Sequence, residues 1–339
     1  MPEHILRIPL SDRAEVLQSI APRAGLPPHV LEKDIWVCWA LAAVFEMPGR
    51  LPLAFKGGTS LSKVYQAIGR FSEDIDLTID YTALSGGTDP LTQEMSGNAI
   101  KNLSETLRAA VSAHTHEVIA PYLARVGEER LGTSLGIEVT ENGEGVRIRY
   151  PTPFGDAPSY LRDRDSVLLE FGGRNTTLPN ERYRVVSYAA AHTDNLEFPV
   201  AEVIVLSPRR SFWEKATLIH AECHRPKRPS GGFGAERLSR HWYDLARLAR
   251  QEIGSAALKD RELLAHVVRL KGIFYRSGFA NYQACLEGKF RLIPDEPLRV
   301  ALERDFSAMV SEGMFFEPPG PFATILEELG ALEMGLNRP

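Results

Sequence analysis

This sequence of 339 residues has few cysteines, no long apolar runs and no net positive charge. Its three cysteines have no paired spacing, which argues against a disulfide framework and favours a reducing cytoplasm. No apolar run is long enough to cross a membrane. The segment Met1–Leu10 has two prolines and charged residues in place of the apolar core of a signal peptide. We therefore predict a cytoplasmic protein with no membrane partner.

The balance of charge and the missing motifs also limit the possible functions. A formal net charge of −5 gives no global sign of nucleic-acid binding, so any such surface must be a local patch. The chain has no Gly-x-Ser-x-Gly elbow of the α/β-hydrolase kind. Its Gly232-x-Gly234 has neither the preceding strand nor the third glycine of a dinucleotide fingerprint.

The length of the chain and its ordinary hydrophobic share of 44% allow a sizeable core and predict two domains. Several strand-like segments lie before Ser207, and helical patterns dominate after it. We predict an α/β (α+β) protein with an N-terminal lobe over residues 1–206 and a helical C-terminal lobe over residues 207–339.

One segment organises the rest of the chain. Residues 55–80 read F-K-G-G-T-S-L-S-K-V-Y-Q-A-I-G-R-F-S-E-D-I-D-L-T-I-D. Gly57 and Gly58 follow a short apolar strand end and permit a tight turn that a ligand can approach closely. Thr59 is then a suitable N-cap for a helix that ends at Gly69. Beyond this helix, apolar and polar residues alternate, which predicts a strand with one buried face.

Two features of this segment suit a nucleoside triphosphate bound with a metal ion. The free N–H groups and the positive end of the dipole at the helix start suit phosphate, and Ser60 and Lys63 share one side of the helix. Asp74 and Asp76 are two residues apart on the strand, so both carboxylates point to one face. Such oxygen ligands suit Mg²⁺, which binds through one or two carboxylates together with substrate phosphates.

These motifs resemble those of a known superfamily. G-G-T-S-L-S-K followed by S-E-D-I-D-L is similar to the signature of nucleotidyltransferases with the DNA polymerase β-type fold. The closer resemblance is to the AbiEii/AbiGii toxin family of type IV toxin–antitoxin and phage-abortive systems. Ser207–Lys215 resembles a family segment that ends in a Glu-Lys pair. Arg240–Leu245 resembles the family's Arg-His-Tyr-Tyr-Asp-Leu segment, with Trp242 in place of the first Tyr, and the resemblance as a whole runs from Leu31 to Leu248.

The resemblance implies a fold and a reaction. The fold is a nucleotidyltransferase-type mixed sheet with flanking helices, followed by a helical C-terminal lobe, with the active site in a cleft between the lobes. The implied toxin transfers a nucleoside monophosphate from an NTP to RNA, with the tRNA 3′ end as the expected acceptor, and releases pyrophosphate. Two Mg²⁺ ions would stabilise the attacking and leaving oxygens. The expected antitoxin acts without forming a stable complex.

The same comparison implies roles for matched positions. The metal ions are assigned to Asp74 and Asp76, which are also catalytic, and the superfamily places a third carboxylate on a neighbouring strand. Glu170 is the candidate for this third carboxylate, and Asp163 and Asp165 compete with it. Asp244 is implied as an essential polar residue near the triphosphate. The predicted triphosphate ligands are Gly57, Gly58, Thr59, Ser60, Lys63 and Lys215.

Further elements are predicted from periodicity. Glu32, Lys33 and Asp34 resemble a segment found before the Gly-Gly motif of the toxin family, but we interpret them as the ordinary exposed first turn of a helix from His29 to Phe45. The other predicted helices span residues 98–126, 208–224 and 235–250, and the predicted strands span residues 137–140, 146–150, 167–171, 183–188 and 200–206.

The segment Arg209–Arg250 is unusually basic. It contains ten Lys or Arg and four Asp or Glu, an excess of six positive charges in an acidic chain. It could line a groove that binds a polyanion such as RNA, with the loop around Arg225, Lys227 and Arg228 as its mobile edge. The alternative is a solvated helix face beside a flexible loop.

Three other functions stay open at this point. The chain could transfer nucleotides to a protein or to a small molecule such as an antibiotic. It could be a non-catalytic nucleotide sensor that binds a triphosphate and never releases pyrophosphate. It could also be a sugar-nucleotide glycosyltransferase that uses the Asp-x-Asp pair, although the Gly-Gly-Thr-Ser motif suits a terminal triphosphate better.

Overall fold

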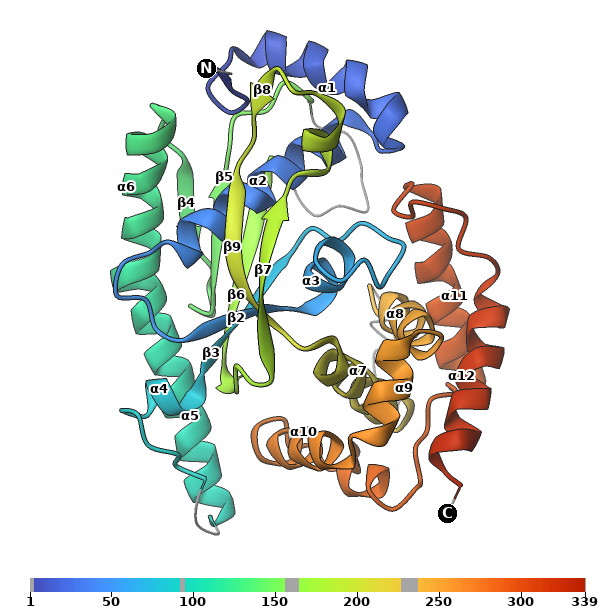
Figure 1. Cartoon of the computed structure of the whole chain (residues 1–339). Coiled ribbons are helices and arrows are strands. Elements are labelled where there is room, and N and C mark those ends of the chain that lie inside the picture. Colours follow the sequence, from blue (N-terminus) through green and yellow to red (C-terminus); the bar gives the residue numbers. More distant parts are fainter. Residues whose placement is uncertain (1–2, 92–94, 156–164, 227–236, 339) are drawn as a thin grey trace. The chain divides into compact units, whose positions relative to one another are not determined.

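The computed structural model describes residues 3–91, 95–155, 165–226 and 237–338. The chain forms two compact units (Figure 1). The first combines Met1–Val64 with Ser72–Leu206, and the second combines Tyr65–Phe71 with Ser207–Pro339. A short segment of the predicted N-terminal lobe is therefore part of the second unit. Among the described residues, no helix is both long and apolar enough to cross a membrane.

The first unit is built on a mixed seven-stranded sheet, as predicted. The strands β3 and β6 are parallel, as are β2 and β9, and the other neighbours are antiparallel. A two-stranded parallel sheet pairs β1 (Glu3–His4) with β8 (Leu196–Glu197). In spatial order the large sheet consists of β4 (Gly136–Val139), β5 (Gly145–Arg149), β6 (Ser166–Asn175), β3 (Ile75–Asp80), β2 (Leu53–Lys56), β9 (Val200–Leu206) and β7 (Asn180–Val186).

The predicted strands are confirmed, with small shifts at their ends. The turn at Thr140–Glu144 joins β4 to β5 as an antiparallel hairpin, in which Thr140 N–H donates to the Gly145 carbonyl at 3.0 Å. Short polar residues and a glycine with φ +69 at Gly143 favour this turn. The strand predicted at 183–188 is β7, which begins at Asn180 and ends at Val186.

The helix α2 (Pro28–Phe45) forms much of the core of the first unit. A proline at its first position suits a helix start, because that N–H would have no partner within the helix. Every residue from Val30 to Phe45 is buried, and the helix packs against β9 and β6. The prediction that its first turn is exposed was therefore wrong. Before it, α1 (Leu10–Ala24) buries Leu17 and Ile20 and ends at a left-handed glycine.

The long helix predicted at residues 98–126 is interrupted. It consists of α5 (Gly97–His114), a π-helical turn at Thr115–Ile119 and α6 (Ala120–Leu131). Ser96 caps α5 by accepting from the Ala99 N–H at 3.2 Å. A proline follows the π-turn at the start of α6, where its missing N–H removes one hydrogen bond from the helical ladder.

The helix α3 (Gly57–Lys63) ends earlier than the predicted stop at Gly69. The segment that follows, Tyr65–Phe71, belongs to the second unit and forms hydrogen bonds within it. Phe71 N–H donates to the Met314 carbonyl at 2.7 Å, and Phe316 N–H donates to the Gly69 carbonyl at 3.1 Å. Gln66 takes the left-handed conformation with φ 49 on the way. Two short helices complete the first unit, α4 (Tyr81–Leu84) and the 3₁₀ turn Tyr188–His192.

The described part of the second unit is helical, as predicted. Caps at α10 and α11 come from Asp260 and Asp295, whose carboxylates accept backbone N–H groups three residues on. Its helices are α7 (Pro208–Cys223), α8 (Ser239–Ala249), α9 (Glu252–Lys259), α10 (Arg261–Phe274), a 3₁₀ turn (Tyr282–Cys285), α11 (Glu296–Ser311) and α12 (Phe322–Leu336).

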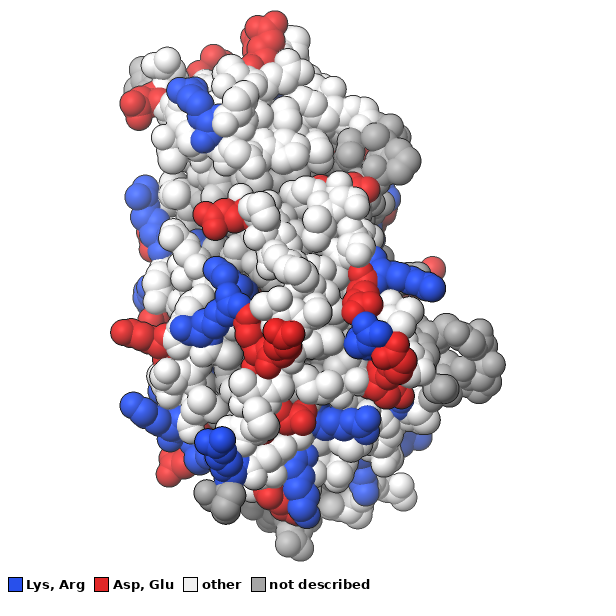
Figure 2. All heavy atoms as spheres, turned by 90° about the vertical axis from the view of Figure 1, so that its right-hand side faces the viewer, with Lys and Arg blue, Asp and Glu red and all other residues white. Residues whose placement is uncertain are grey.

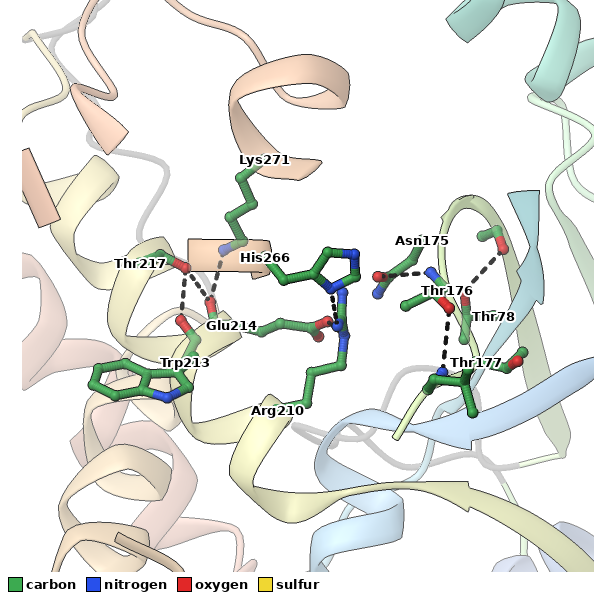
Figure 3. A network of polar contacts seen from close by, with 12 residues as sticks. Thr78, Asn175, Thr176, Thr177, Arg210, Trp213, Glu214, Thr217, His266 and Lys271 are labelled. Carbon is green, nitrogen blue, oxygen red and sulfur yellow. Dashed lines mark hydrogen bonds and ion pairs between the residues drawn. The ribbon is translucent and has the colours of Figure 1, made fainter. Parts of the chain in front are cut away.

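A buried arginine joins α7 to α10 (Figure 3). Arg210 donates to Glu214 Oε1 at 3.1 Å and to His266 Nδ1 at 3.0 Å. A guanidinium can only donate, so His266 accepts at Nδ1 and carries its proton at Nε2. Lys271 of α10 donates to the Glu214 carbonyl at 2.7 Å. These contacts fix the helix that carries Lys215.

His220 on α7 predicts a loss of stability in acid. Its Nδ1 accepts the Arg291 N–H at 3.0 Å and its Nε2 donates to the Asn281 carbonyl at 3.2 Å. Burial lowers the pKa of His220 to about 4, below its ordinary value. Between pH 6.5 and 4 the unfolded chain binds a proton that the folded chain rejects, so stability falls as pH falls. We expect a loss of about 2 kcal/mol between pH 7 and 5.

Urea unfolding at the two pH values measures this effect. His220→Gln keeps an N–H for the Asn281 carbonyl and does not titrate, so its stability should change less between these pH values. His116→Gln, at an exposed position, is the matched control and should keep the wild-type slope. An equal slope in the wild type and in His220→Gln would contradict the prediction.

Candidate active site

The Gly-Gly turn lies directly against the Asp-x-Asp strand. Lys56, the last residue of β2, pairs with Asp76 of β3 across the antiparallel ladder. Gly57 follows with φ +78, a left-handed conformation that favours glycine. A Cβ on Gly57 would lie 1.9 Å from Asp76 Oδ2. The turn and the Asp76 carboxylate, which are separate in the sequence, are therefore in direct contact in the folded chain.

The hydroxyls at the start of α3 are turned inward. Thr59 lies inside the helix and not at its N-cap, which is Lys56, so this detail of the prediction was wrong. The buried Thr59 hydroxyl donates to the Asp74 carbonyl, and Ser60 donates to the Gly57 carbonyl at 3.0 Å. The Thr59 bond holds the helix to Asp74, which lies just before β3 and not on the strand as predicted. The assignment of both residues to the triphosphate stays a prediction.

Glu170 lies beside Asp76 on the neighbouring strand. The two residues are partners in the parallel pairing of β3 with β6, so their side chains leave the same face of the sheet. Asp76 is half-buried and Glu170 is exposed, whereas Leu77 and Phe171, the next pair in register, are buried on the other face. The expected position of a third acid on an adjacent strand is thus met, while its role as a metal ligand stays a prediction.

The acids of this face have the donor chemistry that Mg²⁺ prefers, because each offers carboxylate oxygens. Within the described ranges, however, no group of three or more His, Cys, Asp or Glu side chains is gathered closely enough to hold a metal ion. Asp74 is buried and Asp76 lies at the Gly57 turn. Of the competing acids, Asp165 pairs with Arg149 at 3.3 Å, and Asp163 lies outside the described residues.

Lys63 is held inside the first unit. Its ammonium forms a buried ion pair with Asp34 and lies 3.8 Å from the centre of the Tyr188 ring. Burial lowers the pKa of Lys63, but the nearby Asp34 carboxylate and other neighbouring groups together raise it by more. The net pKa is therefore above its ordinary value. Lys63 therefore stays protonated while it faces Asp34. Its predicted contact with the triphosphate is not tested by this geometry.

Two more charged residues of α2 form buried ion pairs. Lys33 Nζ lies 2.5 Å from Glu73 Oε2, with side-chain exposures of 3% and 1%. Arg13 of α1 lies 3.2 Å from Glu32 Oε1. Sequence reasoning missed these pairs, although charged residues inside an otherwise apolar helix were a visible signal. An unpaired charge in such a place is too costly to persist.

The second unit holds Lys215 and Asp244 in one cluster with Arg70. Lys215 Nζ donates to Asp244 Oδ2 at 2.8 Å. Arg70 donates to Asp244 Oδ1 at 2.7 Å through Nε and to Oδ2 at 2.8 Å through Nη2. This bidentate geometry is the strong form of the arginine–carboxylate pair. Arg70 was missed because the sequence motif gives no sign that residue 70 turns toward residue 244.

The electrostatics of this cluster keep the Asp244 carboxylate ionised. Burial raises the pKa of Asp244, but Arg70 and Lys215 lower it more, so its pKa is below the ordinary value and it stays ionised. Burial lowers the pKa of Lys215, and Asp244 opposes that change. Lys215 is the most exposed of the three side chains, at 9% against 3% and 0%. Its predicted contact with the triphosphate stays a prediction.

The basic segment Arg209–Arg250 is largely neutralised where it is described. Ion pairs form from Arg209 to Asp260 at 3.2 Å and from Arg225 to Glu222 at 2.6 Å. On the face shown in Figure 2, positive and negative side chains are intermingled and do not form a patch of one sign. Lys227 and Arg228, at the predicted RNA-binding edge, lie outside the described residues.

Gly57→Ala tests the contact between the turn and the strand. The left-handed backbone conformation costs about 1–3 kcal/mol for alanine, and the methyl group must displace the Asp76 carboxylate. Since a shift of about 1 Å in a reacting group can cost a hundredfold in rate, we expect activity to fall by about this factor. Gly132→Ala has the same backbone strain, with φ +67, but open space around its Cβ.

Denaturant unfolding and NTP turnover of the two glycine variants separate strain from function. Both should lose stability through backbone strain, Gly57→Ala somewhat more because of its contact with Asp76, and only Gly57→Ala should lose activity. Full activity in a folded Gly57→Ala variant would show that the position of the Asp76 carboxylate is unimportant.

Comparison with known proteins identifies the family. The family model described as nucleotidyl transferase AbiEii toxin, type IV TA system, matches residues 39–328. No curated protein matches the chain. Among solved structures, MenT4, a nucleotidyltransferase toxin from Mycobacterium tuberculosis H37Rv, matches with 17% sequence identity and a TM-score of 0.47, over 93% of this chain and 98% of that chain.

The family match contains the Gly57 turn, the Asp76 strand and the cluster around Asp244, and it extends well beyond Leu248, where the resemblance found in the sequence ends. It confirms that resemblance. The chain therefore belongs to the AbiEii nucleotidyl transferase toxin family of type IV toxin–antitoxin systems.

Proposed function

We propose that this protein transfers a nucleoside monophosphate from an NTP to an RNA hydroxyl and releases pyrophosphate. The tRNA 3′ end is the proposed acceptor. The single observation that carries the proposal is the contact between Gly57 and Asp76, where a Cβ would lie 1.9 Å from the carboxylate. In this contact, a turn suited to binding phosphate meets a carboxylate suited to binding a metal ion, and the chain belongs to a nucleotidyltransferase family.

Each element of the site has a proposed task. The backbone at Gly57 and Gly58, with Thr59 and Ser60, binds the triphosphate. The carboxylates of Asp76 and Glu170, with Asp74 just before the strand as the further candidate, would hold Mg²⁺, which would supply charge stabilisation at the reacting phosphate. The pairing of Asp76 with Glu170 in the register of β3 and β6 supports this role. Lys63 and Lys215 are proposed to contact the triphosphate, and Asp244 is proposed as an essential polar residue near it.

Family membership also supports the biological proposals. A type IV toxin has a cognate antitoxin, and we propose that this antitoxin acts without a stable complex. We propose that the protein works in the cytoplasm, where tRNA and NTPs occur. Neither proposal depends on the details of the site.

Incubation of the protein with each labelled NTP, Mg²⁺ and total RNA tests the proposed reaction. Parallel reactions contain a protein fraction or a small-molecule fraction in place of RNA. Label in tRNA together with released pyrophosphate supports the proposal. Label only in protein or in small molecules would overturn the RNA acceptor and retain nucleotidyl transfer. NTP binding with no pyrophosphate release from any fraction would favour the nucleotide-sensor alternative.

A further inference from the structure

Three consecutive charged residues at the start of α2 are buried and paired. Glu32, Lys33 and Asp34 are at most 3% exposed. Their partners come from three different parts of the first unit. Replacing a buried ion pair with packed apolar residues is often neutral or stabilising, so stability alone does not explain why these charges are present.

Two of these pairs lie where the chain leaves the first unit and returns to it. The first unit ends at Val64 and resumes at Ser72, because the residues between them belong to the second unit. Lys63, one residue before the exit, pairs with Asp34. Glu73, one residue after the return, pairs with Lys33. Lys33 and Asp34, which are adjacent on α2, therefore hold the chain on both sides of the segment Tyr65–Phe71.

The exit is fixed by several contacts. Asp34 accepts the Tyr188 N–H at Oδ2 at 2.7 Å while its Oδ1 faces Lys63. The Tyr188 ring lies under the Lys63 ammonium, and its hydroxyl is 3.2 Å from Ser62 Oγ. Because Lys63 is the last residue of α3, these contacts fix the end of the helix that begins at Gly57.

The segment where the chain re-enters the first unit is fixed next to Asp74 and Asp76, the proposed metal-binding carboxylates. Glu73 directly precedes Asp74, whose carbonyl accepts the Thr59 hydroxyl from α3. The Lys33–Glu73 pair thus sets the path of the backbone at the point where β3 begins. Asp76 lies two residues into this strand, against Gly57.

We infer that Lys33 and Asp34 are positioning residues that hold α3 and β3 in the relative placement the nucleotide site requires. They act through Glu73 and Lys63 and touch no substrate. The inference rests on the proposed function for its effect on rate, but the placement itself can be measured separately. The Arg13–Glu32 pair provides a matched control, since it is equally buried, its carboxylate lies on the same helix next to Lys33, and its partner Arg13 comes from α1 and not from α3 or β3.

The experiment compares Lys33→Gln, Asp34→Asn and Glu32→Gln. Denaturant titrations first establish conditions in which all three variants are folded. Backbone hydrogen exchange at residues 63–76 and single-turnover transfer rates are then measured. We expect faster exchange in Lys33→Gln and Asp34→Asn, and a fall of about a hundredfold in rate, the factor typical of a misplaced reacting group. Glu32→Gln should keep wild-type exchange there and a rate within about twofold, because remote sites are usually independent.

Rescue gives a second readout. The double variant Lys33→Glu with Glu73→Lys reverses the pair and should recover part of the lost rate, whereas general destabilisation would add the two losses. Equal losses in rate and equal exchange in all three single variants would overturn the positioning role. If the wild type transfers no nucleotide, the proposed function fails. The exchange data still decide whether Lys33 and Asp34 hold the segment.

Discussion

Asp76→Asn should abolish nucleotidyl transfer while the protein stays folded. The substitution keeps the size of the side chain beside Gly57 but removes the negative charge that would hold Mg²⁺. A bound metal contributes several kcal/mol of charge stabilisation in such reactions, so we expect a loss of about a thousandfold or more in rate. Asp76 is only half-buried, so little stability should be lost.

Pyrophosphate release at saturating Mg²⁺ measures the effect, with circular dichroism as the check on folding. Asp165→Asn is the matched control, since it removes a carboxylate near the start of β6 that pairs with Arg149. We expect it to retain most of the activity, and Glu170→Gln to lose it. Near-normal release by Asp76→Asn would refute the metal assignment, and loss only in Asp165→Asn would move the third carboxylate there.

Asp244→Asn should produce the largest loss of stability. The substitution would remove the carboxylate charge that both Arg70 and Lys215 contact inside the buried cluster. Removing one partner of a buried ion pair costs about 3–5 kcal/mol. Lys215→Met removes only one of two cations and leaves the bidentate Arg70–Asp244 pair in place. It should therefore cost less stability, while activity is lost if Lys215 contacts the triphosphate.

Urea unfolding separates these variants, and the pH dependence adds a test. The pKa of Asp244 is lowered, so the stability it contributes is present above about pH 4, the ordinary pKa of Asp, and is lost as pH falls toward its folded-state pKa. Glu328→Gln, which breaks the partly exposed pair with Arg250, is the control and should cost at most about 1 kcal/mol. A wild-type unfolding midpoint in Asp244→Asn would show that the cluster contributes nothing.

Local chemistry was predictable from the sequence wherever neighbours along the chain determine it. The Gly-Gly turn needs a left-handed backbone at Gly57, and alternation of apolar residues specifies which face of β3 is buried. The short polar turn before Gly145 likewise specifies a hairpin. Glu170 was expected on a strand next to Asp76, and the register of β6 places it there.

Features decided by distant contacts were not predictable. After α3 ends at Lys63, Gly69 and Phe71 form hydrogen bonds with Phe316 and Met314, and no local pattern near residue 63 can encode these distant partners. The charges of Lys33 and Asp34 looked like an exposed helix start because acids and lysines usually are exposed. Their partners, Glu73 and Lys63, lie in another segment, so only the folded chain reveals that the charges are compensated.

The excursion of Tyr65–Phe71 into the second unit has a consequence for biosynthesis. On the ribosome, Phe71 emerges long before Met314, to which it bonds in the finished protein. Contacts between residues so far apart in sequence form late, because a long loop must close first. We expect nascent chains, truncated products and fragments cut before residue 314 to lack the native path at residues 65–71. A harmful activity would then arise only after the whole polypeptide has been translated and folded.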